Sequence, residues 1–139
     1  MKIHNLEVSN FHGFEHKIFR LSSGFNVLVG DNGTGKTGVL EALAVAGGAL
    51  LIGFQHGYAR YMELDDAYRR GAEVDGILHS QRSYPVVVTS DGTLFRRKKR
   101  WSRSLDGASF TPTTSEDEDI QRLSKRIWDS RLKPSTRDL

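Results

Sequence analysis

Residues 30–37, which read GDNGTGKT, constrain the fold of this chain more than any other stretch. They match G-x-x-x-x-G-K-[ST], the pattern of a phosphate-binding loop. The apolar run at residues 25–29 is typical of a strand covered on both faces, and residues 37–47 favour a helix. A strand, a glycine-rich loop and a helix in this order predict a phosphate site, and the alternative is a glycine-rich turn that matches by accident.

The chemistry of such a loop follows from its residue types. The glycines at positions 30, 33 and 35 lack a Cβ, so the backbone can take positive φ and approach a ligand closely. Successive amides then form an anion-binding concavity at the positive end of a helix. Lys36 is expected to reach the β- and γ-phosphates of a triphosphate, and the Thr37 hydroxyl to ligate Mg²⁺. The predicted binding residues are Gly30, Asp31, Asn32, Gly33, Thr34, Gly35, Lys36, Thr37 and Gly38.

The composition sets broad limits on the class of protein. A chain of 139 residues suggests one soluble domain, and its net charge of +3 is weak evidence for any partner. It has no cysteine, which excludes disulfides and thiolate metal sites and fits a cytoplasmic protein. The N-terminus lacks the apolar run of a signal peptide, and the apolar stretch at residues 39–54 is too short and broken to span a bilayer.

The rest of the chain predicts an α/β domain. Residues 1–21 alternate as two strands around a turn at residues 10–14. Residues 84–101 predict a β-hairpin with its turn at Asp91-Gly92. Residues 51–83 predict no clear element, and residues 64–70 could form a short helix or an exposed loop. Helical spacing of apolar residues runs through Val39, Leu40, Leu43, Ala46 and Leu50, and the helix itself is expected at about 37–47. A second helix is expected at about 116–131, with Ile120, Leu123 and Ile127 on its buried side.

Residues 1–50 resemble the start of ABC-type ATPases of the RecF and structural-maintenance-of-chromosomes (SMC) group, and bacterial AAA-type ATPases of DNA repair and phage defence are similar. The resemblance rests on NFHGF at residues 10–14, FNVLVG at 25–30 with the loop, and VLEAL at 39–43. It implies a P-loop NTPase fold, an ABC-like lobe whose small antiparallel sheet lies near the adenine, with ATP and Mg²⁺ as cofactors. It places the turn at 10–14 beside the nucleotide and makes His12 a binding candidate, although this family usually has a basic residue there. Residues 51–139 look like the family's variable insertion in the same domain.

An ATPase of this group also needs an aspartate after an apolar run, a following glutamate and a Leu-Ser-Gly-Gly signature. Residues 86–91 and 21–24 imitate two of these motifs, but a hairpin turn explains Asp91-Gly92 better, and residues 21–24 precede the loop. We therefore assign no catalytic residue and expect the N-terminal piece of a longer ATPase, or a truncated reading frame. In the family, hydrolysis occurs between two head domains, so this segment alone should bind ATP but hydrolyse little or none. The full-length protein is expected to form a head-to-head dimer and to act in DNA repair or anti-phage DNA processing.

A basic run at residues 96–103 favours an alternative. It could contact the phosphate backbone of DNA, with Trp101 as a stacking platform, in a non-enzymatic module that docks on nucleic acid or protein. The competing interpretation is a solvated edge strand, or an intramolecular partner for the acidic residues 116–119. A small kinase-like enzyme lacks any acceptor or lid signal. The histidines at 4, 12, 16, 56 and 79 show no metal-ligand spacing and are expected at the surface, and Asp65-Asp66 is expected in a solvated loop.

Overall fold

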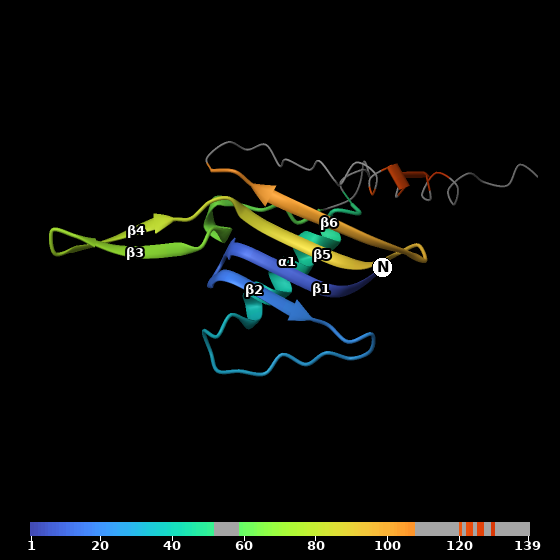
Figure 1. Ribbon diagram of the computed structural model, residues 1–139, viewed down its shortest axis with the longest axis horizontal. Helices are drawn as coiled ribbons and strands as arrows, with labels where there is room; N and C mark the ends of the chain where they lie inside the picture. The colour runs from blue at the N-terminus through green and yellow to red at the C-terminus, as the bar shows by residue number, and fades with distance from the viewer. Residues whose placement is uncertain (52–58, 108–119, 121, 124, 127–128, 130–139) are drawn as a thin grey trace, which may run out of the picture.

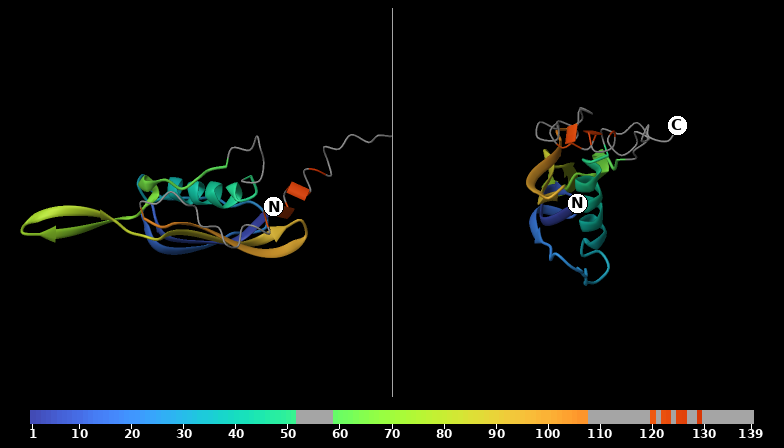
Figure 2. Two further views of the ribbon diagram at one scale, coloured as in Figure 1. Left: turned by 90° about the horizontal axis from the view of Figure 1, so that it is seen from above. Right: turned by 90° about the vertical axis from the view of Figure 1, so that its right-hand side faces the viewer.

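The computed structural model describes residues 1–51, 59–107, 120, 122–123, 125–126 and 129. The architecture is α/β, as predicted: α1 lies against one face of a four-stranded antiparallel sheet with strand order β2-β1-β5-β6 (Figures 1 and 2). A second, two-stranded sheet projects from it. In chain order the elements are β1 (Lys2–Phe11), β2 (Phe14–Arg20), α1 (Lys36–Gly48), the 3₁₀ helix η1 (Leu64–Asp66), β3 (Arg69–Val74), β4 (Ile77–Arg82), β5 (Val86–Leu94) and β6 (Arg97–Leu105).

The two predicted N-terminal strands are present as β1 and β2, which pair antiparallel across the turn at residues 10–14. Leu6 and Val8 are fully buried, while the residues between them face the other side of the sheet. Asn10 and His12 take φ of 50° and 49°, which allows the chain to reverse in so short a turn. The core lies between this sheet and α1 and contains Leu6, Val8, Phe11, Val39, Ala42, Val45, Ala46, Val86 and Val88.

Helix α1 extends one residue beyond the predicted range at each end. The expected apolar face is wrong at Leu40, which is 58 % exposed. Val39 and Ala46 are seven residues apart and share a face, but Leu40 is turned about 100° from Val39. The buried side therefore continues through Ala42 and Val45, whose small side chains let α1 approach the sheet closely.

The predicted strand at residues 25–29 is wrong: the segment is irregular and exposed to solvent. Phe25, Val27 and Val29 are 91 %, 67 % and 89 % exposed. A buried strand needs neighbours that take its backbone hydrogen bonds, and no described strand pairs with this segment. Local contacts organise its start instead, where the Ser22 amide donates to the Asn26 side chain at 2.8 Å.

The predicted hairpin exists as β5 and β6, but its turn is not at Asp91-Gly92, which lie inside β5. The chain reverses at Phe95 and Arg96, whose φ values are 48° and 67°. Gly92 serves a different purpose, because a Cβ there would lie 2.2 Å from the carbonyl oxygen of Lys2 on β1. The glycine is therefore required by the close approach of two strands beside an irregularity in β1.

Trp101 lies inside the molecule, so the predicted stacking platform is wrong. Its side chain is 1 % exposed, and its Nε1–H donates to the Ala46 carbonyl of α1 at 3.0 Å. The alternation of β6 explains this: Trp101, Arg103 and Leu105 face the helix, and the residues between them face the other way. A basic run in a strand thus divides between the two faces of the sheet.

The hairpin formed by β3 and β4 was not predicted. It projects beyond the main sheet (Figure 1), and each of its residues is exposed. Asp75 and Gly76 form its turn with φ of 54° and 76°. An Asp-Gly pair between two short strands is the signal that could have located it. Of the residues 64–70, for which a short helix or an exposed loop was expected, only Leu64–Asp66 are helical, as the 3₁₀ helix η1, and Arg69 and Arg70 begin β3.

The predicted late helix is described at six positions, all of them helical: 120, 122, 123, 125, 126 and 129. Ile120 is buried beside Ala49, Leu94 and Trp101, as expected for the apolar side of this helix. The acidic residues 116–119, Ile127 and His56 lie outside the described residues. In the part of the chain that is described, no helix is long and apolar enough to cross a membrane.

Candidate nucleotide-binding site

The loop at residues 30–35 leads directly into the N-terminus of α1. Gly33 and Gly35 take φ of 86° and 92°, as predicted, in the left-handed region that favours glycine. Gly30 does not have a positive φ. Instead, a Cβ at position 30 would lie 2.7 Å from the Thr34 hydroxyl oxygen, so glycine permits close packing there. Gly33 and Gly35 are therefore needed for the backbone conformation of the loop, and Gly30 is needed for its close packing against Thr34.

Lys36 folds back over the loop. Its Nζ donates to the carbonyl oxygens of Gly30 at 2.6 Å and Asp31 at 2.5 Å, and the Thr34 hydroxyl donates to the same Asp31 oxygen at 2.8 Å. These bonds hold a positive charge within the curve of the loop. The loop residues 31–34 and Thr37 are exposed, so a ligand can reach them from solvent.

The N-terminus of α1 retains donors for an anion. Its N-cap residue, Gly35, provides no side-chain cap, and the first turn contains no acidic residue. The amide of Val39 donates to the Gly35 carbonyl at 3.1 Å and so begins the helical ladder. The amides of Lys36, Thr37 and Gly38 precede that bond at the positive end of the helix dipole, which is the arrangement that binds phosphate.

The turn at residues 10–14 packs against this loop. A Cβ on Gly35 would lie 2.5 Å from the ring of Phe14, and a Cβ on Gly38 would lie 3.3 Å from the Cβ of His12. The Phe14 ring packs edge-to-face against the Phe19 ring, with 5.4 Å between the ring centroids. The position of the turn therefore sets the space available to the loop.

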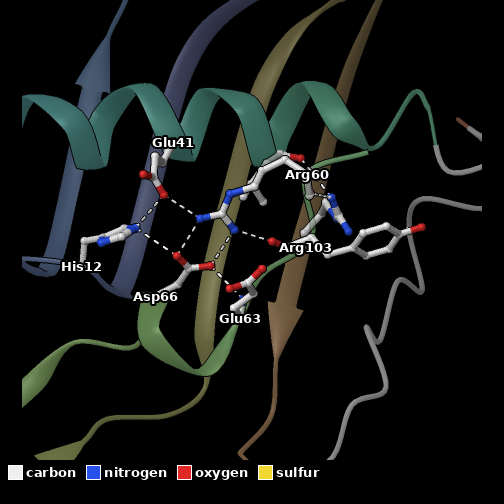
Figure 3. Close-up of polar contacts among 8 residues, drawn as sticks. His12, Glu41, Arg60, Glu63, Asp66 and Arg103 are labelled. Atoms are coloured by element: carbon white, nitrogen blue, oxygen red, sulfur yellow. Dashed lines mark hydrogen bonds and ion pairs between the residues drawn. The ribbon is translucent and has the colours of Figure 1, made fainter. Parts of the chain in front are cut away.

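A charged network lies beside the turn (Figure 3). His12 Nε2 lies 3.1 Å from Glu41 Oε2 and 3.0 Å from Asp66 Oδ1. Arg60 donates to Glu41 at 2.5 Å and to both oxygens of Asp66 at 2.7 Å. Asp66 also accepts from the Glu63 amide at 2.8 Å and is only 3 % exposed, so its expected place in a solvated loop is wrong.

Sequence reasoning missed this network because its members come from separate segments. His12 belongs to the β1–β2 turn, Glu41 to α1 and Asp66 to η1, and Arg60 precedes η1. No local pattern announces a contact between residues so far apart. The carboxylates and imidazole could supply metal-ligand atoms, since these lie within 4.8 Å of one another. However, Arg60 already compensates the charge of both carboxylates, so the geometry is that of an ion-pair network.

Within the network, Arg60 and Asp66 hold each other in their charged forms. Hydrogen bonding to Asp66 raises the pKa of Arg60 above its usual value, with Glu41 adding to the effect against the cost of burial. Burial raises the pKa of Asp66, but hydrogen bonds from Arg60 and the Glu63 amide, with the attraction of Arg60, lower it by more, so that its pKa is below the usual value. The carboxylate and the guanidinium are therefore both charged at neutral pH.

Asp66 should stabilise the fold at neutral pH and lose this effect in acid. Because its folded pKa is lowered, its contribution is complete above the unfolded value of about 3.9 and declines as the pH falls toward the folded value. Asp66→Asn should cost about 2 kcal/mol at pH 7. Urea unfolding of both proteins should show the difference narrowing below about pH 4. Parallel stability curves across this range would contradict the assigned ion pair.

The other predicted residues lie apart from this network. His4 Nε2 lies 3.0 Å from the Thr93 hydroxyl and His16 Nε2 lies 3.0 Å from Glu7, while His79 is exposed on β4. Asp91 accepts from Arg100 at 3.4 Å on β5. The signature-like residues 21–24 form part of the irregular segment before the loop.

Comparison with known proteins finds a family match at the start of the chain and partial similarity to DNA repair proteins. Residues 1–46 match the AAA ATPase domain family. The chain is 49 % identical over 43 residues to the DNA replication and repair protein RecF of Clostridium novyi, covering 31 % of this chain and 12 % of that protein. It is 27 % identical over 130 residues to RecF of Bifidobacterium adolescentis, covering 88 % of this chain and 31 % of that protein. It is 40 % identical over 45 residues to the DNA double-strand break repair Rad50 ATPase of Pyrococcus abyssi, covering 32 % of this chain and 5 % of that protein.

These matches confirm the resemblance of the first part of the chain to the RecF and SMC-like group. The chain spans less than a third of the length of each of these three relatives, as their covered shares of 12 %, 31 % and 5 % show.

Proposed function

We propose that this chain is the ATP-binding segment at the N-terminus of an ATPase that couples ATP binding and hydrolysis to DNA repair or anti-phage DNA processing. The observation that carries the proposal is the loop at residues 30–35, which holds the Lys36 ammonium and opens onto the uncapped end of α1. The similarity to the AAA ATPase domain over residues 1–46 and to RecF and Rad50 supports it.

Each residue of the proposed site has a distinct role. The amides at residues 33–38 surround the phosphates, Lys36 supplies a point charge, and the Thr37 hydroxyl is the Mg²⁺ ligand. Mg²⁺, when bound, neutralises phosphate charge. The donor set suits this ion, because hydroxyl and phosphate oxygens are the ligands that it prefers. His12 flanks the site through its packing against Gly38.

The wider organisation is also a proposal. Residues 1–50 form the nucleotide-binding core, and residues 51–139 form an insertion of the same domain whose strands β5 and β6 extend the sheet beside β1. Hydrolysis is assigned to an engaged pair of head domains in a cytoplasmic, full-length protein, so this segment binds ATP and turns it over slowly or not at all.

Calorimetric titration of the chain with ATP and Mg²⁺ tests the proposal. A saturable heat with one site per chain is expected, and it should weaken when EDTA removes the Mg²⁺. The absence of any saturable heat would refute the assignment of residues 30–38 as a nucleotide site.

A specific surface favours the alternative function, a module that docks on nucleic acid. In the described ranges, Arg96, Arg97, Lys98 and Lys99 have no ion-pair partner, although they follow one another at the β5–β6 turn. A cavity of about 630 Å³ lies beside them. It is lined by His4, Asn5, Asp91, Gly92, Lys98, Lys99 and Arg100. Clustered positive charge of this kind suits the phosphodiester backbone.

If this surface binds DNA, Lys98→Glu should weaken binding to a duplex oligonucleotide several-fold and make the dependence of affinity on salt less steep. Lys17→Glu, which makes the same charge change at an exposed position on β2, is the matched control and should have a smaller effect. Fluorescence anisotropy across a salt series measures both. Equal effects of the two substitutions would show that net charge, and not this surface, determines binding.

A further inference from the structure

The turn at residues 10–14 touches the proposed nucleotide loop on one side and the base of the β3–β4 hairpin on the other. Its Phe14 ring packs against Gly35. On the opposite side, the His12 amide donates to the Asp66 carbonyl at 2.6 Å, and the Tyr68 amide donates to the Asn10 carbonyl at 2.9 Å. The loop and the hairpin are therefore connected through one short segment of backbone.

Side chains reinforce this connection at the same point (Figure 3). The Asp66 carboxylate and Glu41 of α1 both contact His12 Nε2, and Arg60 joins the two carboxylates. Asp66 is almost completely buried. Without its carboxylate, the half-buried Arg60 guanidinium would keep only its ion pair with Glu41. The network thus fixes His12, and with it the turn, relative to both α1 and η1.

We propose that Asp66 and Glu41 are positioning residues for the nucleotide site, which act through His12 and couple nucleotide binding to the base of the β3–β4 hairpin. This inference rests on the proposed ATP-binding function. Loosening the turn releases Phe14 from Gly35 and lets the loop leave the conformation that binds phosphate. Because binding free energies are reciprocal, ATP that orders the loop must also tighten the contacts between the turn and the hairpin base.

Asp65 offers a matched control for Asp66. Both residues belong to η1 and both form ion pairs, but Asp65 is exposed and bonds to Arg69 at 3.2 Å and Arg82 at 2.7 Å on the hairpin itself. Asp66→Asn should weaken the affinity for ATP with Mg²⁺ about tenfold, and Asp65→Asn should leave it unchanged. Calorimetry measures the affinities, and thermal unfolding establishes that each variant is folded.

Glu41→Gln provides a second variant in case Asp66→Asn does not fold. The Glu41 side chain is 36 % exposed, so the fold should tolerate its neutralisation. The Glu41→Gln substitution removes one of the two carboxylates that contact His12 and leaves the Arg60–Asp66 ion pair in place. We expect a loss of ATP affinity of about five-fold.

Hydrogen exchange separates positioning from a purely structural role. In the unmodified chain, ATP with Mg²⁺ should slow exchange at the amides of His12 and Tyr68, and Asp66→Asn should abolish this protection. Wild-type ATP affinity in folded Asp66→Asn and Glu41→Gln would overturn the inference, as would an ATP complex in which these amides exchange as fast as without ATP. Failure of the unmodified chain to bind ATP would overturn the proposed function as well, and it is visible before any variant is made.

Discussion

Replacing Lys36 with alanine should reduce the affinity for ATP with Mg²⁺ by at least about a hundredfold, which corresponds to ~2.7 kcal/mol. The ammonium is the positive side chain that the structure places within the loop, where it bonds to the carbonyls of Gly30 and Asp31. Without it, the backbone amides would face a highly charged triphosphate with no full positive charge from the loop itself. Calorimetric titration of the variant measures the loss directly.

The fold should survive this substitution, because Lys36 bonds to an exposed loop and lies outside both hydrophobic clusters. Unfolding curves of Lys36→Ala and the unmodified chain should therefore agree closely. Lys17→Ala removes an exposed lysine from β2 and should leave the affinity for ATP unaltered. A folded Lys36→Ala protein that binds ATP as tightly as the unmodified chain would defeat the site assignment.

Trp101→Ala should destabilise the protein by about 3–5 kcal/mol, a large part of the stability of a typical domain. The indole is 1 % exposed and packs with Ala49, Leu94 and Ile120. Its truncation would leave a cavity between β6 and α1 and remove the bond to the Ala46 carbonyl. Equilibrium unfolding in urea gives the change in the free energy of unfolding.

Trp101→Phe separates the two contributions of this side chain. It keeps most of the ring volume and loses the Nε1–H donor, so its cost should be about 1–2 kcal/mol, clearly below that of alanine. An alanine variant with unchanged stability would mean that Trp101 lies at the surface, and it would restore the stacking role that the structure excludes.

Local patterns in the sequence were sufficient for the elements that local physics determines. The alternation of Leu6 and Val8 located β1, and the loop followed by an apolar periodic segment located α1. The positive φ of Gly33 and Gly35 also follows from the loop pattern. These features depend on neighbours a few residues away, which a single sequence displays.

The errors arose where distant segments meet. Asp91-Gly92 has the composition of a hairpin turn, yet glycine is needed there because the Lys2 carbonyl of another strand leaves no room for a Cβ. Trp101 is flanked in the sequence by basic residues, as in a nucleic-acid contact, yet the register of β6 turns its side chain toward α1. The ion pair between Arg60 and Asp66 depends on tertiary packing, so no spacing along the chain announces it.

Backbone amide shifts during titration with ATP and Mg²⁺ test the central claim most directly, because the claim is that main-chain donors at residues 33–38 surround a phosphate group. The account predicts that the largest shifts in the NMR spectrum fall on the amides of Gly33, Gly35, Lys36 and Thr37, with smaller changes at His12. Shifts confined to the β5–β6 turn, or a spectrum unchanged at saturating ATP, would contradict it.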